Sequence, residues 1–424
     1  MEKGLKKVVL GLVAVGLSIT LLLTGAIPAC EAGPDERVVK IGLHAGLSGP
    51  WPTCIAGYNQ GLIDYVKYAS DQELIKGIAP EVIWEDAGGS VSKSLVAHKR
   101  FLEADAIMEV NWNSTPTETL TPRLQADEMP MMYLGCMTMP MVTEPVRWVF
   151  STNPGWRTIA WFFAKWAADR LVPEELPVRI GYIGYDNVSA REGAEGFKTA
   201  AQKGIKCELT GIEFVPIMPI DTSTELLRLA AKKPHWIMFG VAGAATTVVT
   251  KDFARLGLKD QIKSVTPLGS IFGENTINIV GRAAEGLVSE FAWPACARGA
   301  DRDLPGVKLA CEIAKIYRGW DPEHATMGGY IAGCQQAMVC LEGIRLAVEG
   351  VGLENLTRRA VRDGLASIKD FDTGGLMPPT TMSDRSPWYN AYLRMYIVRE
   401  GQYELLSDWE KTPFFLEYFE KLGD

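Results

Sequence analysis

Two hydrophobic patterns alternate along the chain from Val38 onward. Short apolar runs bounded by glycine or proline are typical of buried parallel strands, and longer stretches with an apolar residue every three or four positions are typical of amphipathic helices. In the first part of the chain they predict strands at residues 38–43, 82–84, 106–110 and 131–134, with helices at residues 56–70, 92–103 and 116–127. This alternation predicts a doubly wound α/β sheet.

The alternation starts again after Phe150 and predicts a second lobe. Strands are expected at residues 178–183, 207–214, 236–240 and 265–268, and helices at residues 158–169, 191–203, 223–232 and 246–256. The strand at residues 265–268 is expected to be the last of this lobe, and a strand at residues 284–291 is expected to leave it. Helices at residues 306–318 and 325–348 and a hairpin of residues 391–398 and 403–409 follow.

Composition narrows the possible functions. The chain has 424 residues, 47% of them hydrophobic and 22% charged, which is enough for two domains with a substantial core. Disordered, collagen-like and multi-span membrane proteins are excluded. The formal net charge is −8 and no basic cluster follows the first residues, so we expect no nucleic-acid partner. Four histidines and eight scattered cysteines without zinc spacing predict no metal site.

The first thirty residues have the pattern of an export signal. Three lysines precede an uncharged run over residues 8–23, and the Ile-Pro-Ala-Cys that ends at Cys30 resembles the lipobox of bacterial lipoproteins, from which Pro28 departs. This resemblance implies a signal peptide over residues 1–29, lipidation of Cys30 and a tether over residues 30–37. The alternative is an uncleaved N-terminal helix. Both place the protein at the membrane and its body outside the cytoplasm.

Sequence motifs of common enzymes are missing. The chain has no GxGxxG after the first strand, no Walker loop, no GxSxG and no HExxH. His44 has no paired nucleophile and is interpreted as a pocket or loop residue. Glu85 and Asp86 are neighbours on a strand, so their side chains point to opposite faces and cannot share a substrate. We therefore expect a protein that is not an enzyme and needs no cofactor.

Several segments occur in the order found in branched-chain amino-acid binding proteins of ABC importers. They include VKIGLHAGLSGPW, MEVNWNSTPTETLTPRLQADEMPMM, RIGYIGYDNVSAREGAEGFKTAAQKGIK, AKKPHWIMFG, AAEGLVSEFAW and FDTGGLMPP. The chain resembles this family from about Val38 to Trp409. The resemblance implies a type I periplasmic binding protein fold, in which two doubly wound Rossmann-like lobes are joined by a three-crossover hinge. Residues 38–150 with about 290–375 would form lobe 1, and about 151–289 with about 376–424 lobe 2.

The resemblance also implies a function. A protein of this family is an extracytoplasmic solute-binding lipoprotein that delivers a small solute to the permease subunits of an ABC importer. A ligand-sensing receptor component of the same fold is the alternative, but it would need a signalling segment, and none follows Trp409. A Rossmann-type enzyme fits less well, because the Gly-Leu-Ser-Gly at residues 46–49 lacks the spacing of a phosphate-binding loop.

The aromatic residues after the first predicted strand are candidate binding residues. Ligands of open α/β sheets bind beyond the carboxyl ends of the strands, at the switch point of the strand order. Trp51 follows the first strand in a Leu-Ser-Gly-Pro-Trp loop, and Tyr58 lies further along. One interpretation is an aromatic lid over the solute. The alternative is a loop whose Trp51 packs against its own lobe.

A helix start after the third predicted strand is a candidate anion site. Trp112, Asn113, Ser114 and Thr115 follow this strand and precede Pro116. Free backbone N–H groups and hydroxyl groups at a helix N-terminus favour an anion. The family resemblance implies that Ser114 and Thr115 hold the carboxylate of the ligand, and plain helix capping is the alternative.

Gly135 and Cys136 follow the fourth predicted strand. The resemblance implies that backbone and small side chains at this point contact the same carboxylate. The compartment permits disulfides, and Cys54 with Cys136 is the first pair to consider. Six methionines lie within residues 129–141 and are typical of an apolar core or pocket edge.

The second lobe supplies candidates after three predicted strands. Tyr185 is a candidate to stack on the ligand, and Asp186 is a candidate cap of the next helix. Gly240 and Val241 follow another strand, and Ser270 follows the next one.

One departure from the family changes the expected solute. Amino-acid binders place a tyrosine near Ala242 and an acid near Gly269 or Ser270, which together hold the ammonium group, and this chain has neither. A buried ammonium without a carboxylate partner is unfavourable. Glu290 or Asp186 is the possible substitute. Beside a branched-chain amino-acid-like solute, we therefore expect and prefer a small carboxylate with an apolar or aromatic body.

Overall fold

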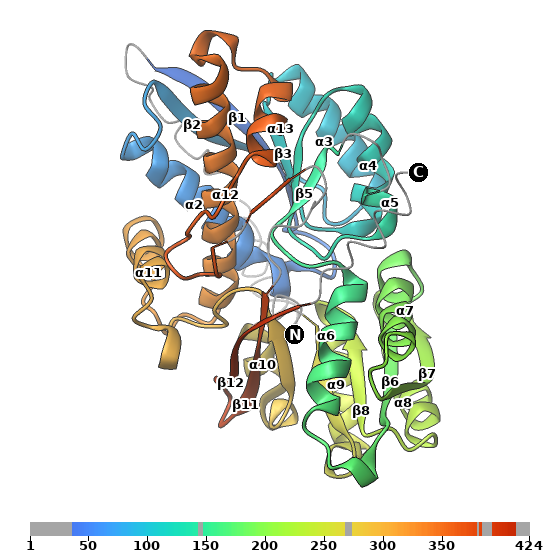
Figure 1. The fold of residues 1–424 in the computed structure, drawn as a ribbon. Coiled ribbons are helices and arrows are strands. Elements are labelled where there is room, and N and C mark those ends of the chain that lie inside the picture. The colour runs from blue at the N-terminus through green and yellow to red at the C-terminus, as the bar shows by residue number, and fades with distance from the viewer. Residues whose placement is uncertain (1–35, 143–146, 268–273, 380, 384–391, 413–424) are drawn as a thin grey trace, which may run out of the picture.

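The first lobe is built on a five-stranded parallel sheet. The computed structural model describes residues 36–142, 147–267, 274–379, 381–383 and 392–412, and the first sheet has the order β2-β1-β3-β4-β5 (Figure 1). Its strands are β1 (Arg37–Ala45), β2 (Ile78–Asp86), β3 (Met108–Asn111), β4 (Met131–Tyr133) and β5 (Val149–Ser151). The order reverses at β1, because β2 pairs with one side of it and β3 with the other. This confirms the predicted doubly wound α/β class.

Helices cover both faces of this sheet. They are α2 (Pro52–Asp71), α3 (Val91–Glu103), α4 (Ser114–Ala126), α5 (Met139–Val142), α11 (Pro305–Arg318), α12 (Met327–Val351) and α13 (Arg358–Ala366). The long helix α12 lies along α2 (Figure 1). A Cβ atom at Gly61 or Gly333 would overlap with the backbone of the facing helix. Glycine at these two positions therefore lets the two helix backbones touch and bury most of α12.

The second lobe is built on a seven-stranded mixed sheet of order β12-β11-β10-β9-β8-β6-β7. Its strands are β6 (Val178–Tyr185), β7 (Cys207–Val215), β8 (Trp236–Gly240), β9 (Lys263–Thr266), β10 (Val288–Phe291), β11 (Tyr392–Arg399) and β12 (Gln402–Lys411). Strands β6 to β10 are parallel, and β11 and β12 form an antiparallel hairpin on β10. The helices are α6 (Trp156–Ala168), α7 (Val188–Gln202), α8 (Ser223–Ala230), α9 (Ala244–Arg255) and α10 (Glu274–Val280).

Two predictions about the sheets were wrong. The strand at residues 265–268 does not close the second lobe, because β10 pairs with β9 and extends the same sheet. For the same reason the strand at residues 284–291 does not leave the lobe. All four residues of β10 are buried, which is possible only because the β11–β12 hairpin covers the edge that β10 would otherwise expose. The three-residue strand β5 and the helices α5, α10 and α13 were not predicted.

The chain passes between the lobes three times, between β5 and α6, between β10 and α11, and between α13 and β11. The lobes also contact each other away from these connections. The Ala244 N–H donates to the Pro50 carbonyl over 3.1 Å, and the Ser189 hydroxyl donates to that of Ser114 over 2.5 Å. The two lobes therefore touch each other across the cleft between them. Among the helices that the structure describes, none is both long and apolar enough to cross a membrane.

Candidate functional site

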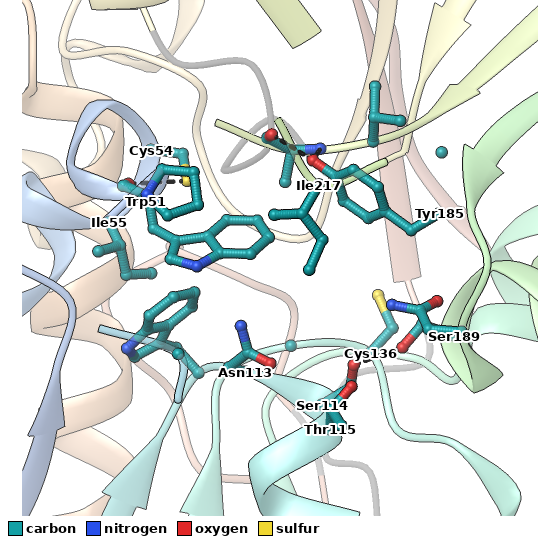
Figure 2. A pocket seen from close by; sticks show the side chains of 18 of the residues that line it. Trp51, Cys54, Ile55, Asn113, Ser114, Thr115, Cys136, Tyr185, Ser189 and Ile217 are labelled. Atoms are coloured by element: carbon teal, nitrogen blue, oxygen red, sulfur yellow. Dashed lines mark hydrogen bonds between the residues drawn. The ribbon is translucent and has the colours of Figure 1, made fainter. Parts of the chain in front are cut away.

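A cavity of about 600 Å³ lies between the two lobes (Figure 2). In the first lobe its walls come from the start of α2 and from the loops after β2, β3 and β4. In the second lobe they come from Trp156 at the start of α6 and from the loops after β6, β7 and β8. Every one of these segments follows a strand or begins a helix. The cavity thus lies where open α/β sheets bind ligands.

Helix N-termini give the cavity its electrostatic character. Residues at the starts of α2, α3, α4, α6 and α7 line it, and each helix N-terminus carries a partial positive charge from its free N–H groups. Among the described residues, no Asp, Glu, Lys, Arg or His side chain lines the cavity. The field in the cavity therefore favours an anionic or neutral ligand over a cation.

The N-terminus of α4 has the geometry of an anion site. The Asn111 side-chain oxygen accepts the N–H groups of Trp112, over 2.8 Å, and Asn113, over 3.2 Å, and so turns the chain out of β3. The Asn113 side chain does not cap α4, and the first N–H groups of a helix have no intrahelical acceptor. In the part of the chain that the structure describes, the N–H groups of Ser114 and Thr115 thus have no acceptor and can bind a ligand, and neither side chain acts as the N-cap.

Aromatic rings form much of the remaining wall. Trp51 meets Trp112 edge-on, with ring centroids 5.5 Å apart, and meets Tyr185 of the other lobe at 6.0 Å. The Tyr185 hydroxyl donates to the Ala242 carbonyl over 2.7 Å and accepts the Ala242 N–H over 3.1 Å. Because its hydroxyl group is occupied, Tyr185 offers its ring to a ligand. Trp51 thus packs against its own lobe through Trp112 and also contacts the other lobe through Tyr185.

The loop after β2 brings the backbone of Gly88 and Gly89 to the wall, where the Gly88 N–H already donates to the Ala45 carbonyl over 3.1 Å. Gly88 and Gly89 have φ angles of +53° and +75°, a region that favours glycine. A Cβ atom at Gly89 would lie 2.7 Å from the Trp51 indole nitrogen and 2.8 Å from the Asn113 amide nitrogen. Sequence reasoning missed this loop, although a Gly-Gly-Ser run directly after a predicted strand is the kind of signal that marks such sites.

Most of the predicted site residues line the cavity. These are Trp51, Trp112, Asn113, Ser114, Thr115, Gly135, Cys136, Tyr185, Gly240 and Val241. Ser270 lies outside the described residues. Tyr58 does not line the cavity. It lies two turns into α2, is buried, and donates its hydroxyl hydrogen to Gln336 of α12, so of these two aromatic residues only Trp51 lies at the cavity.

Glu290 also does not line the cavity. Its side chain is fully buried on β10, and neither carboxyl oxygen has a hydrogen-bond partner among the described residues. Burial raises the pKa of Glu290 well above its usual range and so favours the neutral form of the carboxyl group. In this arrangement Glu290 is not placed to be the counter-ion of a ligand in the cavity. Asp186 cannot serve either, because it pairs with Arg191 at an exposed position, and Asn187 caps α7 in its place.

The remaining candidates are two cysteines, His44 and the methionines of β4. Cys54 and Cys136 line the cavity as free thiols and do not form the disulfide considered above. Burial raises the pKa of Cys54 to about 12 and that of Cys136 well above its usual range, so both stay protonated. His44 is neither a pocket nor a loop residue, since it is buried on β1 and contacts Glu109 over 2.8 Å. The methionines of β4 are core residues.

Sequence reasoning missed one more wall of the cavity. Pro216, Ile217 and Met218 line it and follow β7, which is the edge strand of the second sheet. Edge-strand loops are not expected at the switch point of a sheet, and the position of β7 in the sheet order cannot be read from the sequence.

A family model of periplasmic binding proteins matches residues 38–400. The chain belongs to the periplasmic binding protein family. Proteins of this family bind solutes outside the cytoplasm, and this one has the type I fold with two α/β lobes. This confirms the family resemblance found in the sequence. A search of curated proteins gave no match.

Solved structures of ABC transporter components share the fold of this periplasmic binding protein. A branched-chain amino-acid ABC transporter protein from Thermus thermophilus with bound valine has a TM-score of 0.78 at 18% identity, covering 91% of this chain and 99% of the other. A solute-binding protein from R. palustris in complex with 4-hydroxybenzoate has a TM-score of 0.73 at 14% identity, covering 89% and 98%. A fatty acid ABC transporter substrate-binding protein from Thermomonospora curvata has a TM-score of 0.75 at 16% identity, covering 92% and 96%.

Proposed function

We propose that this protein binds a carboxylate with an apolar or aromatic body outside the cytoplasm and delivers it to the permease subunits of an ABC importer. The observation that carries the proposal is the cavity lining, in which aromatic rings and helix N-termini meet without a charged side chain among the described residues. Helix N-termini favour the carboxylate, and the rings favour the apolar body.

The lining also argues against a free amino acid. An α-ammonium group enclosed in the cavity would need a carboxylate partner, because a buried unpaired charge is strongly unfavourable. The described wall supplies none, and residues 268–273, Leu-Gly-Ser-Ile-Phe-Gly, contain no acidic residue. Two of the similar structures carry names that fit the proposed class, since one holds 4-hydroxybenzoate and another is a fatty acid transporter component.

The N-terminal part of the chain supports the place of action. Residues 1–35 lie outside the described residues, and their sequence favours export with residues 1–29 as signal peptide and Cys30 as the lipid-modified anchor. Cys30→Ser should then release the protein from membranes into the soluble fraction. A variant that stays membrane-bound would favour an uncleaved helix over residues 8–23.

Ligand binding to the purified protein tests the proposal. Thermal-shift and calorimetric titrations should compare leucine and valine with 4-methylpentanoate and benzoate, which keep the carboxylate and an apolar body without the ammonium group. At a hundredfold excess over Kd, a bound acid should stabilise the fold by about 2.7 kcal/mol. Leucine binding that equals or exceeds the binding of 4-methylpentanoate would overturn the proposed ligand class.

A further inference from the structure

The loop after β7 reaches the cavity from an unusual place. Strand β7 (Cys207–Val215) is the edge strand of the second sheet, yet Pro216, Ile217 and Met218 line the cavity. The first lobe likewise contributes the loop after its edge strand β2, through Gly88 and Gly89. The cavity therefore extends from the switch points towards the edges of both sheets.

The exposure of this loop is unusual for an apolar wall. Ile217 is 51% and Met218 66% exposed, although both line the cavity. Exposed apolar residues that occur singly need no explanation, but here consecutive apolar residues stand together at the wall of a binding cavity. Covering them with an apolar ligand group would remove their surface from water, which is favourable in proportion to the area covered. This surface is thus suited to an apolar part of the ligand.

The cavity is also large for the solute that the family resemblance suggested. One water molecule occupies about 30 Å³ of liquid, so a volume of about 600 Å³ corresponds to about twenty groups of that size. This volume lies in the range of cavities that take drug-sized ligands. A compact acid placed at the start of α4 would leave the part of the cavity beside residues 216–218 unfilled by ligand.

Figure 2 shows how the two ends of the cavity are arranged. Ser114 and Thr115 lie at one side and Ile217 lies across the cavity from them, with its side chain directed inward. A ligand with its carboxylate at α4 would extend past the rings of Trp51 and Tyr185 to reach Ile217. The polar end and the exposed apolar end of the cavity thus match the two ends of an amphiphile.

We propose that the ligand is a monocarboxylate with an extended apolar tail, and that Pro216, Ile217 and Met218 form the wall that selects for this tail. The inference rests on the proposed function, because it places the carboxylate at the start of α4. It adds a loop that determines specificity and an expected length for the tail of the ligand. Since the volume of about 600 Å³ corresponds to about twenty water-sized groups, it has room for a carboxylate with a tail of about eight to twelve carbons.

Calorimetric titration with straight-chain monocarboxylates of four, six, eight, ten and twelve carbons tests this proposal. Affinity should rise about fourfold with each added methylene until the tail fills the cavity. Ile217→Ser and Met218→Ser should each weaken binding of the ten-carbon acid about tenfold and change binding of butyrate less than twofold. Ile220→Ser is the matched control, since Ile220 is 98% exposed and belongs to the same loop but does not line the cavity.

The outcomes separate the two proposals. Affinity that does not rise with chain length, or that is unchanged for the ten-carbon acid in both wall variants, would overturn the tail-binding wall and leave the carboxylate proposal standing. A loss of uptake in cells without a loss of affinity would likewise overturn it and would indicate that the loop contacts the permease. If no monocarboxylate of any length binds, the proposed function fails. Melting temperatures of the variants should match that of the unchanged protein, because both side chains are largely exposed.

Discussion

The buried carboxyl group of Glu290 should make the stability of this fold depend on pH. This carboxyl group is fully buried without a hydrogen-bond partner in the described part of the chain, and burial raises its pKa. The folded protein thus binds a proton that the unfolded chain releases above about pH 4.3. The contribution of Glu290 to the free energy of unfolding is therefore fully present below that pH. As the pH rises, the free energy of unfolding falls by about 1.4 kcal/mol per pH unit up to the raised pKa.

Glu290→Gln should remove this loss, because the amide has the same shape and does not ionise. We expect the variant to exceed the unchanged protein in unfolding free energy at pH 8 and to match it more closely at pH 5, as measured by urea denaturation. Glu312→Gln, at an exposed position of α11, is the control and should have little effect at either pH. A variant that is less stable at pH 8 would mean that the carboxylate has a partner in the folded protein.

A second buried network joins β1, α3, β3 and the end of α4. Glu109 contacts His44 over 2.8 Å and His98 over 2.6 Å, and His98 contacts Asp127 over 3.0 Å. Burial opposes the charge on both groups, but these hydrogen bonds outweigh it, so the pKa of Glu109 is lowered and that of His98 is raised. The Glu109 contribution is lost as the pH falls through its lowered pKa, and the His98 contribution is lost as the pH rises through its raised pKa.

His98→Gln should therefore destabilise the protein most between these two pKa values. Hydrogen bonds to charged groups are worth about 1.5–3 kcal/mol each, so we expect a loss of about that size near pH 6. The difference should shrink as the pH rises through the raised pKa of His98, where His98 loses its charge in the unchanged protein. Guanidinium denaturation from about pH 5 to about pH 10 would measure it, and a loss that is constant over this range would exclude the charged pair.

At the scale of elements, the sequence predicted what depends on local pattern. Apolar runs and helix periodicity located most strands and helices within a few residues, and residues directly after strands, such as Trp51 and Tyr185, do line the cavity. Sheet order depends on long-range pairing, so the place of β10 and the edge position of β7 could not be predicted. Tyr58 was misplaced for a related reason, since α2 begins at Pro52 and turns that side chain towards α12.

The start of α4 is the element whose role in binding can be tested most directly. Replacing Ser114 and Thr115 together by alanine removes two hydroxyl groups and keeps the backbone N–H groups. Charge-assisted hydrogen bonds are worth about 1.5–3 kcal/mol, so carboxylate affinity measured by calorimetry should fall by about tenfold to a hundredfold. Thr119→Ala on the exposed side of the same helix should leave affinity unchanged. Unchanged affinity in the double variant would remove the hydroxyl groups from the anion site.

At the scale of the whole molecule, binding and lobe closure should be coupled. Contacts across the cleft join the start of α2 to the start of α9, through Pro50 and Ala244, and the start of α4 to α7, through Ser114 and Ser189. Residues from the starts of α2, α4 and α7 line the cavity, as does Ala242 in the loop that leads into α9. A ligand that contacts both lobes favours the closed arrangement only by its differential affinity for that arrangement. A change that blocks closure should therefore weaken binding without removing any ligand contact.

Gly243 offers such a change, with a matched control in the same lobe. Gly243 has a φ of +57°, and a Cβ atom there would overlap with the Pro50 carbonyl of the other lobe. Gly257 has a φ of +67° and nothing within 4 Å of its Cβ position, so Gly257→Ala places an alanine at a positive φ without the clash. The backbone strain is smaller in this control, because the ψ of Gly257 is +15° whereas that of Gly243 is −130°. We expect Gly243→Ala to lose the ligand-induced decrease in radius of gyration in solution scattering and to bind at least tenfold more weakly. Gly257→Ala should lose about 1 kcal/mol of stability and still close and bind. If both variants close and bind alike, contact between Pro50 and the Gly243 turn is not needed for closure.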